Sequence, residues 1–151
     1  MKPIGKIIEG RELFSVESTA SVLDAVKLMA EKKIGALPVL SGGEMVGVFS
    51  ERDLMTRVIV AGRDPGATPV ADVMTLDPIV ADVGESYDEC LRRMQQASCR
   101  HLPVVSEKGL VGMISLRDLL IVELDTKEDH IRYLDAYLHD EPPPPASTPS
   151  K

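Results

Sequence analysis

The chain lacks long apolar runs and has little aromatic character. Aromatic residues make up 3% of its 151 residues and none is Trp, so the core must be aliphatic and base stacking has few rings to use. The formal net charge is −7 at pH 7, which argues against a general binder of polyanions. No run approaches the roughly 20 apolar residues of a membrane helix, and none near the start resembles a signal peptide. We expect a cytoplasmic protein with neither membrane nor nucleic-acid partners.

Cysteine is also scarce. Cys90 and Cys99 are the two cysteines of the sequence, and their spacing fits neither a Cys-x-x-Cys motif nor a zinc site with a second pair. We expect two free thiols, because disulfides are rare in reducing compartments. Cys99 stands beside Arg100, which leaves a thiol-based enzyme open as an alternative to a buried structural cysteine.

An internal repeat is what the chain does have. The heptapeptide GVFSERD at 47–53 recurs as GMISLRD at 112–118, an offset of 65 residues. The same offset aligns further identical residues without a gap, among them Ser21 with Ser86, Met29 with Met94, Leu37 with Leu102, Pro38 with Pro103 and Val39 with Val104. Fixed-period similarity of this extent indicates a tandem duplication.

Each copy predicts the order β-α-β-β-α, which is an α/β (α+β) fold of two packed repeats. The first copy predicts strands and helices at 14–16, 21–33, 37–40, 45–49 and 50–61. The second copy predicts them at 78–80, 86–98, 102–105, 110–114 and from 115 onward. The predicted division of the chain is a first domain 7–61, a Gly/Pro-rich linker 62–72, a second domain 73–124, a C-terminal helix 125–139 and a disordered Pro-rich tail 140–151.

The repeated heptapeptide places a Ser-x-x-Asp at the point where a strand ends and a helix begins. A helix start exposes backbone N–H groups and the positive end of the helix dipole, so it can hold an anion. A carboxylate there can accept from two neighbouring hydroxyls. Both Ser50 with Asp53 and Ser115 with Asp118 fit this pattern. The same residues also fit a capping box, and the two interpretations are compatible.

The motifs LPVL at 37–40 and LPVV at 102–105, together with the two Gly-x-x-Ser-x-x-Asp stretches, carry a family resemblance. The chain resembles a tandem pair of CBS domains, named for cystathionine β-synthase, from about Ile7 to Leu124. The resemblance implies two repeats packed with pseudo-twofold symmetry, with shared clefts between them. It also implies binding of adenosyl ligands, a regulatory role and assembly as a homodimer.

Carried over to this sequence, the resemblance implies two clefts. In the first, Ser115 and Asp118 would hold the sugar, and Arg100 and His101 would hold phosphate. The base would meet a set of residues from the other half: Phe14, Ile34, Gly35 and Ala36. This cleft is expected to be the better phosphate site.

In the second cleft, Ser50 and Asp53 would hold the sugar, and Arg52 would supply positive charge near the ligand. The base would meet Thr75, Asp77, Ile79 and the backbone of Cys99–His101. Gly35 and Ala36 stand at the positions equivalent to Arg100 and His101 and carry no charge.

The expected function is that of a non-catalytic regulatory module that binds AMP, ADP, ATP or a NAD-like nucleotide. It would act in trans on an unidentified protein, as a homodimer, with no metal and no catalytic cofactor. The alternatives are an interaction scaffold that binds no nucleotide and, less favoured, the thiol-based enzyme at Cys99.

Overall fold

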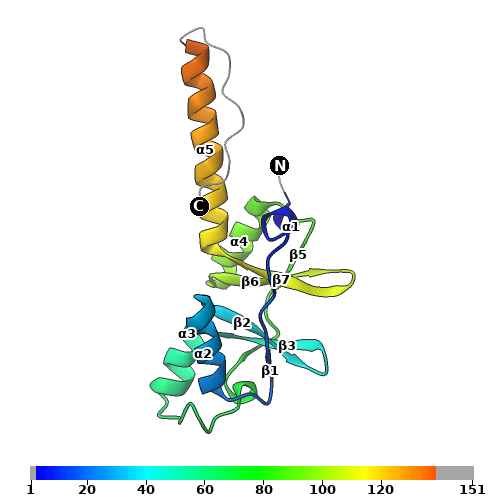
Figure 1. Cartoon of the computed structure of the whole chain (residues 1–151), viewed down its shortest axis with the longest axis vertical. Helices are drawn as coiled ribbons and strands as arrows, with labels where there is room; N and C mark the ends of the chain where they lie inside the picture. Colours follow the sequence, from blue (N-terminus) through cyan, green and yellow to red (C-terminus); the bar gives the residue numbers. More distant parts are fainter. Residues whose placement is uncertain (1–2, 139–151) are drawn as a thin grey trace.

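The two copies of the repeat fold into two small sheets, each flanked by helices, as the sequence predicts (Figure 1). This computed structural model describes residues 3–138; the tail expected at 140–151 lies outside the described residues. The first half contains β1 (Val16–Glu17), α2 (Val22–Lys32), β2 (Ala36–Ser41), β3 (Glu44–Ser50), α3 (Glu51–Asp53) and η1 (Leu54–Ile59). The second contains β5 (Ala81–Asp82), α4 (Tyr87–Ala97), β6 (His101–Ser106), β7 (Gly109–Ser115) and α5 (Leu116–Leu138).

Capping residues explain where α2 and α4 begin and end. The hydroxyl of Ser21 accepts a hydrogen bond from the Asp24 N–H, and the hydroxyl of Ser86 accepts one from the Glu89 N–H. Each helix ends at a residue with left-handed backbone, Lys33 for α2 and Ser98 for α4. Such residues satisfy the last carbonyls of a helix and stop it.

Equivalent strands pair in the same register in both sheets. The first sheet has the order β1-β2-β3-β4, where β4 is Thr75–Leu76, and the second has the order β5-β6-β7. β1 runs parallel to β2 with Val16 opposite Val39, and β5 runs parallel to β6 with Ala81 opposite Val104. Each residue of the second pair stands 65 positions after its counterpart in the first pair, so the two sheets have the same hydrogen-bonding register.

The first strand of each half begins later than the sequence predicts. Strands predicted at 14–16 and 78–80 are observed as β1 at Val16–Glu17 and β5 at Ala81–Asp82. Each pairs for two residues with its neighbour, because the preceding segment is still crossing from the other half of the molecule. Pro78 also lacks the N–H that a sheet ladder uses.

The segment before each half packs on the opposite half (Figure 1). Helix α1 (Ile4–Ile7) belongs to the second half in space: the Ile4 N–H donates to the Glu85 carbonyl and the Gly5 N–H to the Val83 carbonyl. The connection after η1 stays with the first half through η2 (Val70–Asp72) and through β4, which pairs with β3. The two halves are thereby linked by exchanged segments.

Two aliphatic cores result, one for each half. The first holds buried side chains from α2, β2, β3, η1 and the linker: Val22, Ala25, Met29, Leu37, Val39, Phe49, Val58, Val70, Val73 and Met74. The second includes two residues of the N-terminal segment: Ile4, Ile8, Ala81, Cys90, Met94, Leu102, Val104, Ile114 and Leu119. α1 therefore contributes to a core whose other members begin more than 70 residues later in the chain.

The helices that follow the repeated motif differ from each other. After Asp53 the chain makes a π-helical turn, η1, instead of the continuous α-helix predicted to 61. The Thr56 hydroxyl donates to the Arg52 carbonyl at 2.8 Å, a local bond that competes with the regular helix pattern. α5 is a continuous helix that extends away from both sheets (Figure 1). Residues 3–138 contain no helix long and apolar enough to cross a membrane.

Candidate functional site

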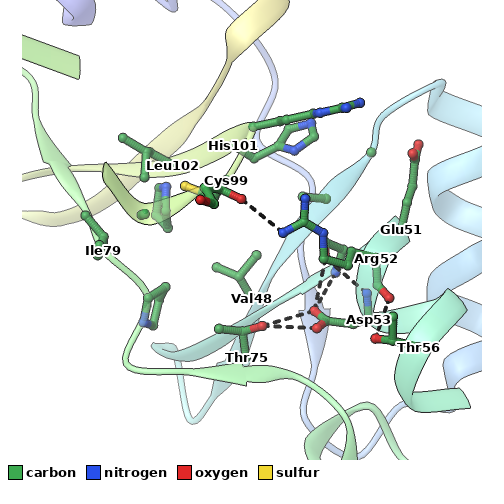
Figure 2. A pocket seen from close by; sticks show the side chains of 18 of the residues that line it. Val48, Glu51, Arg52, Asp53, Thr56, Thr75, Ile79, Cys99, His101 and Leu102 are labelled. Atoms are coloured by element: carbon green, nitrogen blue, oxygen red, sulfur yellow. Dashed lines mark hydrogen bonds between the residues drawn. The ribbon is translucent and has the colours of Figure 1, made fainter. Parts of the chain in front are cut away.

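A cleft of about 650 Å³ lies between the halves, lined by β2, β3, α3 and η1 on one side and by the end of α4 and the start of β6 on the other (Figure 2). Most of the sequence-predicted site residues line it: Gly35, Ala36, Ser50, Arg52, Asp53, Thr75, Asp77, Ile79, Cys99, Arg100 and His101. Its volume lies within the range that small-molecule sites usually have.

Asp53 is the most buried polar group of the cleft, with 4% of its surface exposed. It closes a capping box: the Ser50 N–H and hydroxyl both donate to Asp53 Oδ2, and the Asp53 N–H donates back to Ser50 Oγ. The Thr75 hydroxyl lies 3.1 and 3.2 Å from the two carboxylate oxygens (Figure 2). Thr75 therefore contacts the carboxylate at which the sequence predicts the sugar.

Two arginines of the first half reach across this site. Arg52 Nη1 donates to the carbonyl of Ser98, the residue that ends α4, at 3.0 Å (Figure 2). Arg57 donates to the carbonyls of Val73 and Met74 and lies 3.7 Å from Asp53 Oδ1. Arg52 thereby joins the two halves and stabilises the negative end of α4, whereas Arg57 joins η1 to the linker that packs on the first half.

The cleft carries charges of both signs. Three arginines, Arg52, Arg57 and Arg100, line it together with three carboxylates, Glu51, Asp53 and Asp77. A guanidinium suits a phosphate because it presents a planar array of donors, whereas a carboxylate suits a hydroxyl donor. Apolar lining is supplied by Val48 and Ile79.

The His101 ring of the second half lies against Gly35 of the first half. A Cβ at Gly35 would lie 2.9 Å from His101 Cε1 and 3.0 Å from Glu51 Oε1, so only glycine fits there without displacing a neighbour. Burial lowers the pKa of His101 below its ordinary value; the nearby Glu51 and Asp118 carboxylates oppose this effect, and Arg100 adds to it. The imidazole is therefore largely neutral at pH 7.

We expect the half-buried His101 to make stability fall on mild acidification. Below about pH 6.5 the unfolded chain takes up a proton at His101 that the folded chain takes up only at lower pH. The free energy of unfolding should drop from pH 7 toward pH 5.5, and His101→Asn should flatten that dependence. Urea denaturation at three pH values measures it. An identical pH dependence in the wild type and the variant would contradict this account.

The second predicted sugar carboxylate, Asp118, has a different neighbour. Its Oδ2 accepts the Ser115 N–H at 2.8 Å and lies 3.0 Å from Nη1 of Arg11. Burial alone would raise the pKa of Asp118, but the hydrogen bonds from Arg11 and Ser115 outweigh it and hold the pKa below its usual value. His101 pairs with Ser115 between β6 and β7, and the Leu116 N–H donates to the Arg100 carbonyl. Arg100 and His101 therefore lie beside the second motif, and they also line the cleft that contains Asp53.

Phe14 and Ile34, expected at the base slot of the Asp118 cleft, pack against the core of the first half. The Lys32 ammonium lies 5.1 Å from the centre of the Phe14 ring, a cation–π contact. Gly35 and Ala36, predicted for the same slot, line the Asp53 cleft, and their role at Asp118 stays a prediction.

Sequence reasoning missed Arg11 and Arg57, which contact the two motif carboxylates. Arg57 could have been found, because it stands four residues after Asp53 on the same helical face. Arg11 carried no such signal, since it lies over a hundred residues before Asp118 in the chain.

The two cysteines are free thiols, as the sequence predicts. Burial raises the pKa of Cys99, and the nearby Arg52 only partly opposes it. The pKa of Cys90 is raised to about 11, chiefly by burial. A raised pKa leaves less thiolate at neutral pH, the opposite of what a nucleophilic cysteine requires.

The fold and cleft together define a tandem-repeat module with a ligand-sized site between its halves. The family model of the CBS domain matches residues 5–60 and 70–125. The chain belongs to the CBS domain family, and its fold is that of a CBS-pair regulatory module.

Relatives of similar size support this assignment. The chain is 34% identical over 144 residues to the mitochondrial CBS domain-containing protein CBSX3 of Arabidopsis thaliana, covering 91% of this chain and 69% of that protein. It is 30% identical over 116 residues to the CBS domain-containing protein YhcV of Bacillus subtilis, covering 77% and 82%. A solved CBS-domain structure from Burkholderia ambifaria is 37% identical with a TM-score of 0.76, covering 79% and 91%.

Proposed function

We propose that this module is a non-catalytic sensor that binds an adenine nucleotide in the Asp53 cleft. One observation carries the proposal: a buried carboxylate at a helix start lies in a cleft of about 650 Å³ that also holds Arg52, Arg57 and Arg100. Ribose hydroxyls would donate to Asp53, and the arginines would face phosphate. The base would lie against Val48 and Ile79.

Binding at this cleft requires a local exchange of hydrogen bonds. The Asp53 carboxylate already accepts from Ser50 and from the Thr75 hydroxyl. A ribose hydroxyl would replace the Thr75 hydroxyl, and both donors are neutral. Such an exchange leaves the number of hydrogen bonds to the carboxylate unchanged.

A thermal melt with AMP, ATP, NAD or S-adenosylmethionine tests this function. A bound ligand at about 100 times its Kd should stabilise the protein by roughly 2.7 kcal/mol. Asp53→Asn should remove most of this shift while the protein stays folded. Asp72→Asn is a matched control, because Asp72 pairs with Arg63 at the surface, outside the cleft lining. The absence of a shift with all four ligands would refute the proposal.

An interaction scaffold is the second candidate function. The observation that favours it is the hydrogen bonding of Asp53, whose carboxylate is used by Ser50 and Thr75. A purely capping Asp53 predicts that Asp53→Asn changes stability by about 1 kcal/mol and changes no ligand response.

We propose that the module works as a homodimer. Two pairs of exposed apolar side chains occupy equivalent positions of the repeat, Met55 with Leu120 and Ile59 with Leu124, with exposed fractions between 45% and 60%. A second copy related by a twofold axis could cover both faces, and homo-oligomers favour such closed symmetry. Light scattering should report twice the chain mass, and the double variant Ile59→Glu, Leu124→Glu should report the monomer.

On binding a ligand, the module would change its shape or its assembly, and a second protein would respond to that change in trans. A ligand shifts such an equilibrium only if it binds one state better than the other. The two halves meet at the cleft through the Arg52–Ser98 hydrogen bond, so a ligand there contacts both. The free thiols Cys90 and Cys99 favour a reducing compartment such as the cytoplasm.

A further inference from the structure

The N-terminal segment places the Arg11 guanidinium beside Asp118, one of the two motif carboxylates. Arg11 Nη1 lies 3.0 Å from Oδ2 of Asp118, the same oxygen that accepts the Ser115 N–H. The Arg11 N–H donates to the carbonyl of Ile8, whose side chain is buried in the second core. Arg11 is therefore held at this position by the packing of the segment that carries it.

Asp53 meets an uncharged donor in the equivalent position. The 65-residue offset aligns Thr75 with Gly10 and Leu76 with Arg11, so the two donors come from corresponding crossing segments. Asp53 accepts from the Thr75 hydroxyl, whereas Asp118 pairs with the Arg11 guanidinium. Arg57 Nε also lies 3.7 Å from Asp53 Oδ1, so both carboxylates have a cation nearby. At Asp118, however, a guanidinium lies at 3.0 Å, whereas the donor at that distance from Asp53 is the neutral Thr75 hydroxyl.

This difference decides what a sugar hydroxyl would have to displace. At Asp53 one neutral hydroxyl replaces another. At Asp118 a neutral hydroxyl must replace a charge-assisted hydrogen bond, which is roughly twice as strong as a neutral one. The Asp118 side chain is 17% exposed and the Asp53 side chain 6% exposed. Accessibility alone would therefore favour binding at Asp118, so it does not explain a preference for the Asp53 cleft.

We propose that Arg11 determines which cleft accepts a nucleotide: its guanidinium occupies the Asp118 carboxylate, so that one nucleotide binds per chain, at Asp53. This inference rests on the proposed nucleotide-binding function and adds its stoichiometry and its selectivity. Removal of the guanidinium frees Asp118 for a second ribose. With Arg11 present, the Asp118 cleft binds about 10- to 100-fold more weakly than the Asp53 cleft, the range expected for losing one hydrogen bond to a charged group.

Calorimetric titration with AMP tests the proposal. The wild type should bind one AMP per chain and Arg11→Ala should bind two. Arg11→Lys keeps a cation near the carboxylate and should remain at one. Arg92→Ala is the matched control, because it removes an exposed arginine from a surface pair with Glu89, and it should also remain at one. Two AMP per wild-type chain, or one per Arg11→Ala chain, would overturn the proposal.

A second measurement needs no ligand and separates the two possible failures. The carboxyl pKa of Asp118, followed by NMR, should rise in Arg11→Ala relative to wild type. An unchanged pKa would show that Arg11 does not engage Asp118 in solution and would overturn the inference alone. A raised pKa without AMP binding by either protein would instead overturn the nucleotide function, and with it the selectivity that rests on it.

Discussion

Phe49→Ala is expected to lower the free energy of unfolding by about 3–5 kcal/mol, the range for removing a buried aromatic ring. Phe49 is fully buried on β3, opposite Leu37 of β2, in the core of the first half. The sequence contains two Phe and no Trp, so few other large side chains could refill the space. The surrounding aliphatic residues would have to collapse into the cavity, which close-packed cores do only partly.

Urea denaturation followed by circular dichroism measures this loss. Phe49→Leu is the matched control and should lose about 1 kcal/mol, because it keeps most of the apolar volume. Ile114 stands at the equivalent position of the second half and is also fully buried; Ile114→Val should lose about 0.5–1.5 kcal/mol. A loss below 1 kcal/mol for Phe49→Ala would show that the side chain is not buried in solution.

Gly47→Ala is expected to be more destabilising than Gly112→Ala, although the two glycines are equivalent in the repeat. A Cβ at Gly47 would lie 2.7 Å from the Thr75 carbonyl oxygen and 2.7 Å from Met74 Sδ. The backbone of β4 would have to move, and overpacking of this kind typically destabilises by about 1–3 kcal/mol. A Cβ at Gly112 would meet the end of the Ile8 side chain at 2.8 Å, and that end can rotate away.

Thermal unfolding of the two variants compares these cases directly. For a chain of this size, 1 kcal/mol corresponds to about 2–4 °C in Tm. The Gly47→Ala variant should also weaken the hydrogen bond between the Thr75 hydroxyl and Asp53, because the new Cβ would displace the backbone of Thr75 itself. Equal losses in Tm for both glycine variants would contradict the argument that the obstacle is backbone in one half and a flexible side chain in the other.

Some elements were predicted correctly from the sequence and others were not. Capping patterns located α2 and α4 well, because Ser21 and Ser86 act through local hydrogen bonds. The first strand of each half was placed two to three residues too early, because its pairing partner and the crossing segment lie elsewhere in the chain. The π-helical turn of η1 was not predicted either, and no local pattern accounts for it: the Thr56 hydroxyl donates to the Arg52 carbonyl there, but Thr126 makes the same kind of bond inside α5, which stays α-helical.

The same distinction applies to the candidate site. Most of its residues were predicted, because the repeat and the family motifs are local patterns. What only the structure shows is that Arg100 and His101 lie between both motifs: they line the Asp53 cleft, and His101 pairs with Ser115 across β6 and β7. Phe14 and Ile34 are partly buried and pack against the first core. The binding roles of all these residues stay predictions until a ligand is tested.

The sequence by itself determined the duplication, the β-α-β-β-α order within each repeat, and the two Ser-x-x-Asp motifs, because each depends on residues that are close in the chain or recur at one offset. Tertiary structure alone decided what each motif carboxylate contacts. Thr75 reaches Asp53 through β4, and Arg11 reaches Asp118 through a segment that packs on the opposite half. Two motifs that are equivalent in sequence thereby differ in the group at hydrogen-bond distance from the carboxylate, a neutral hydroxyl at Asp53 and a guanidinium at Asp118.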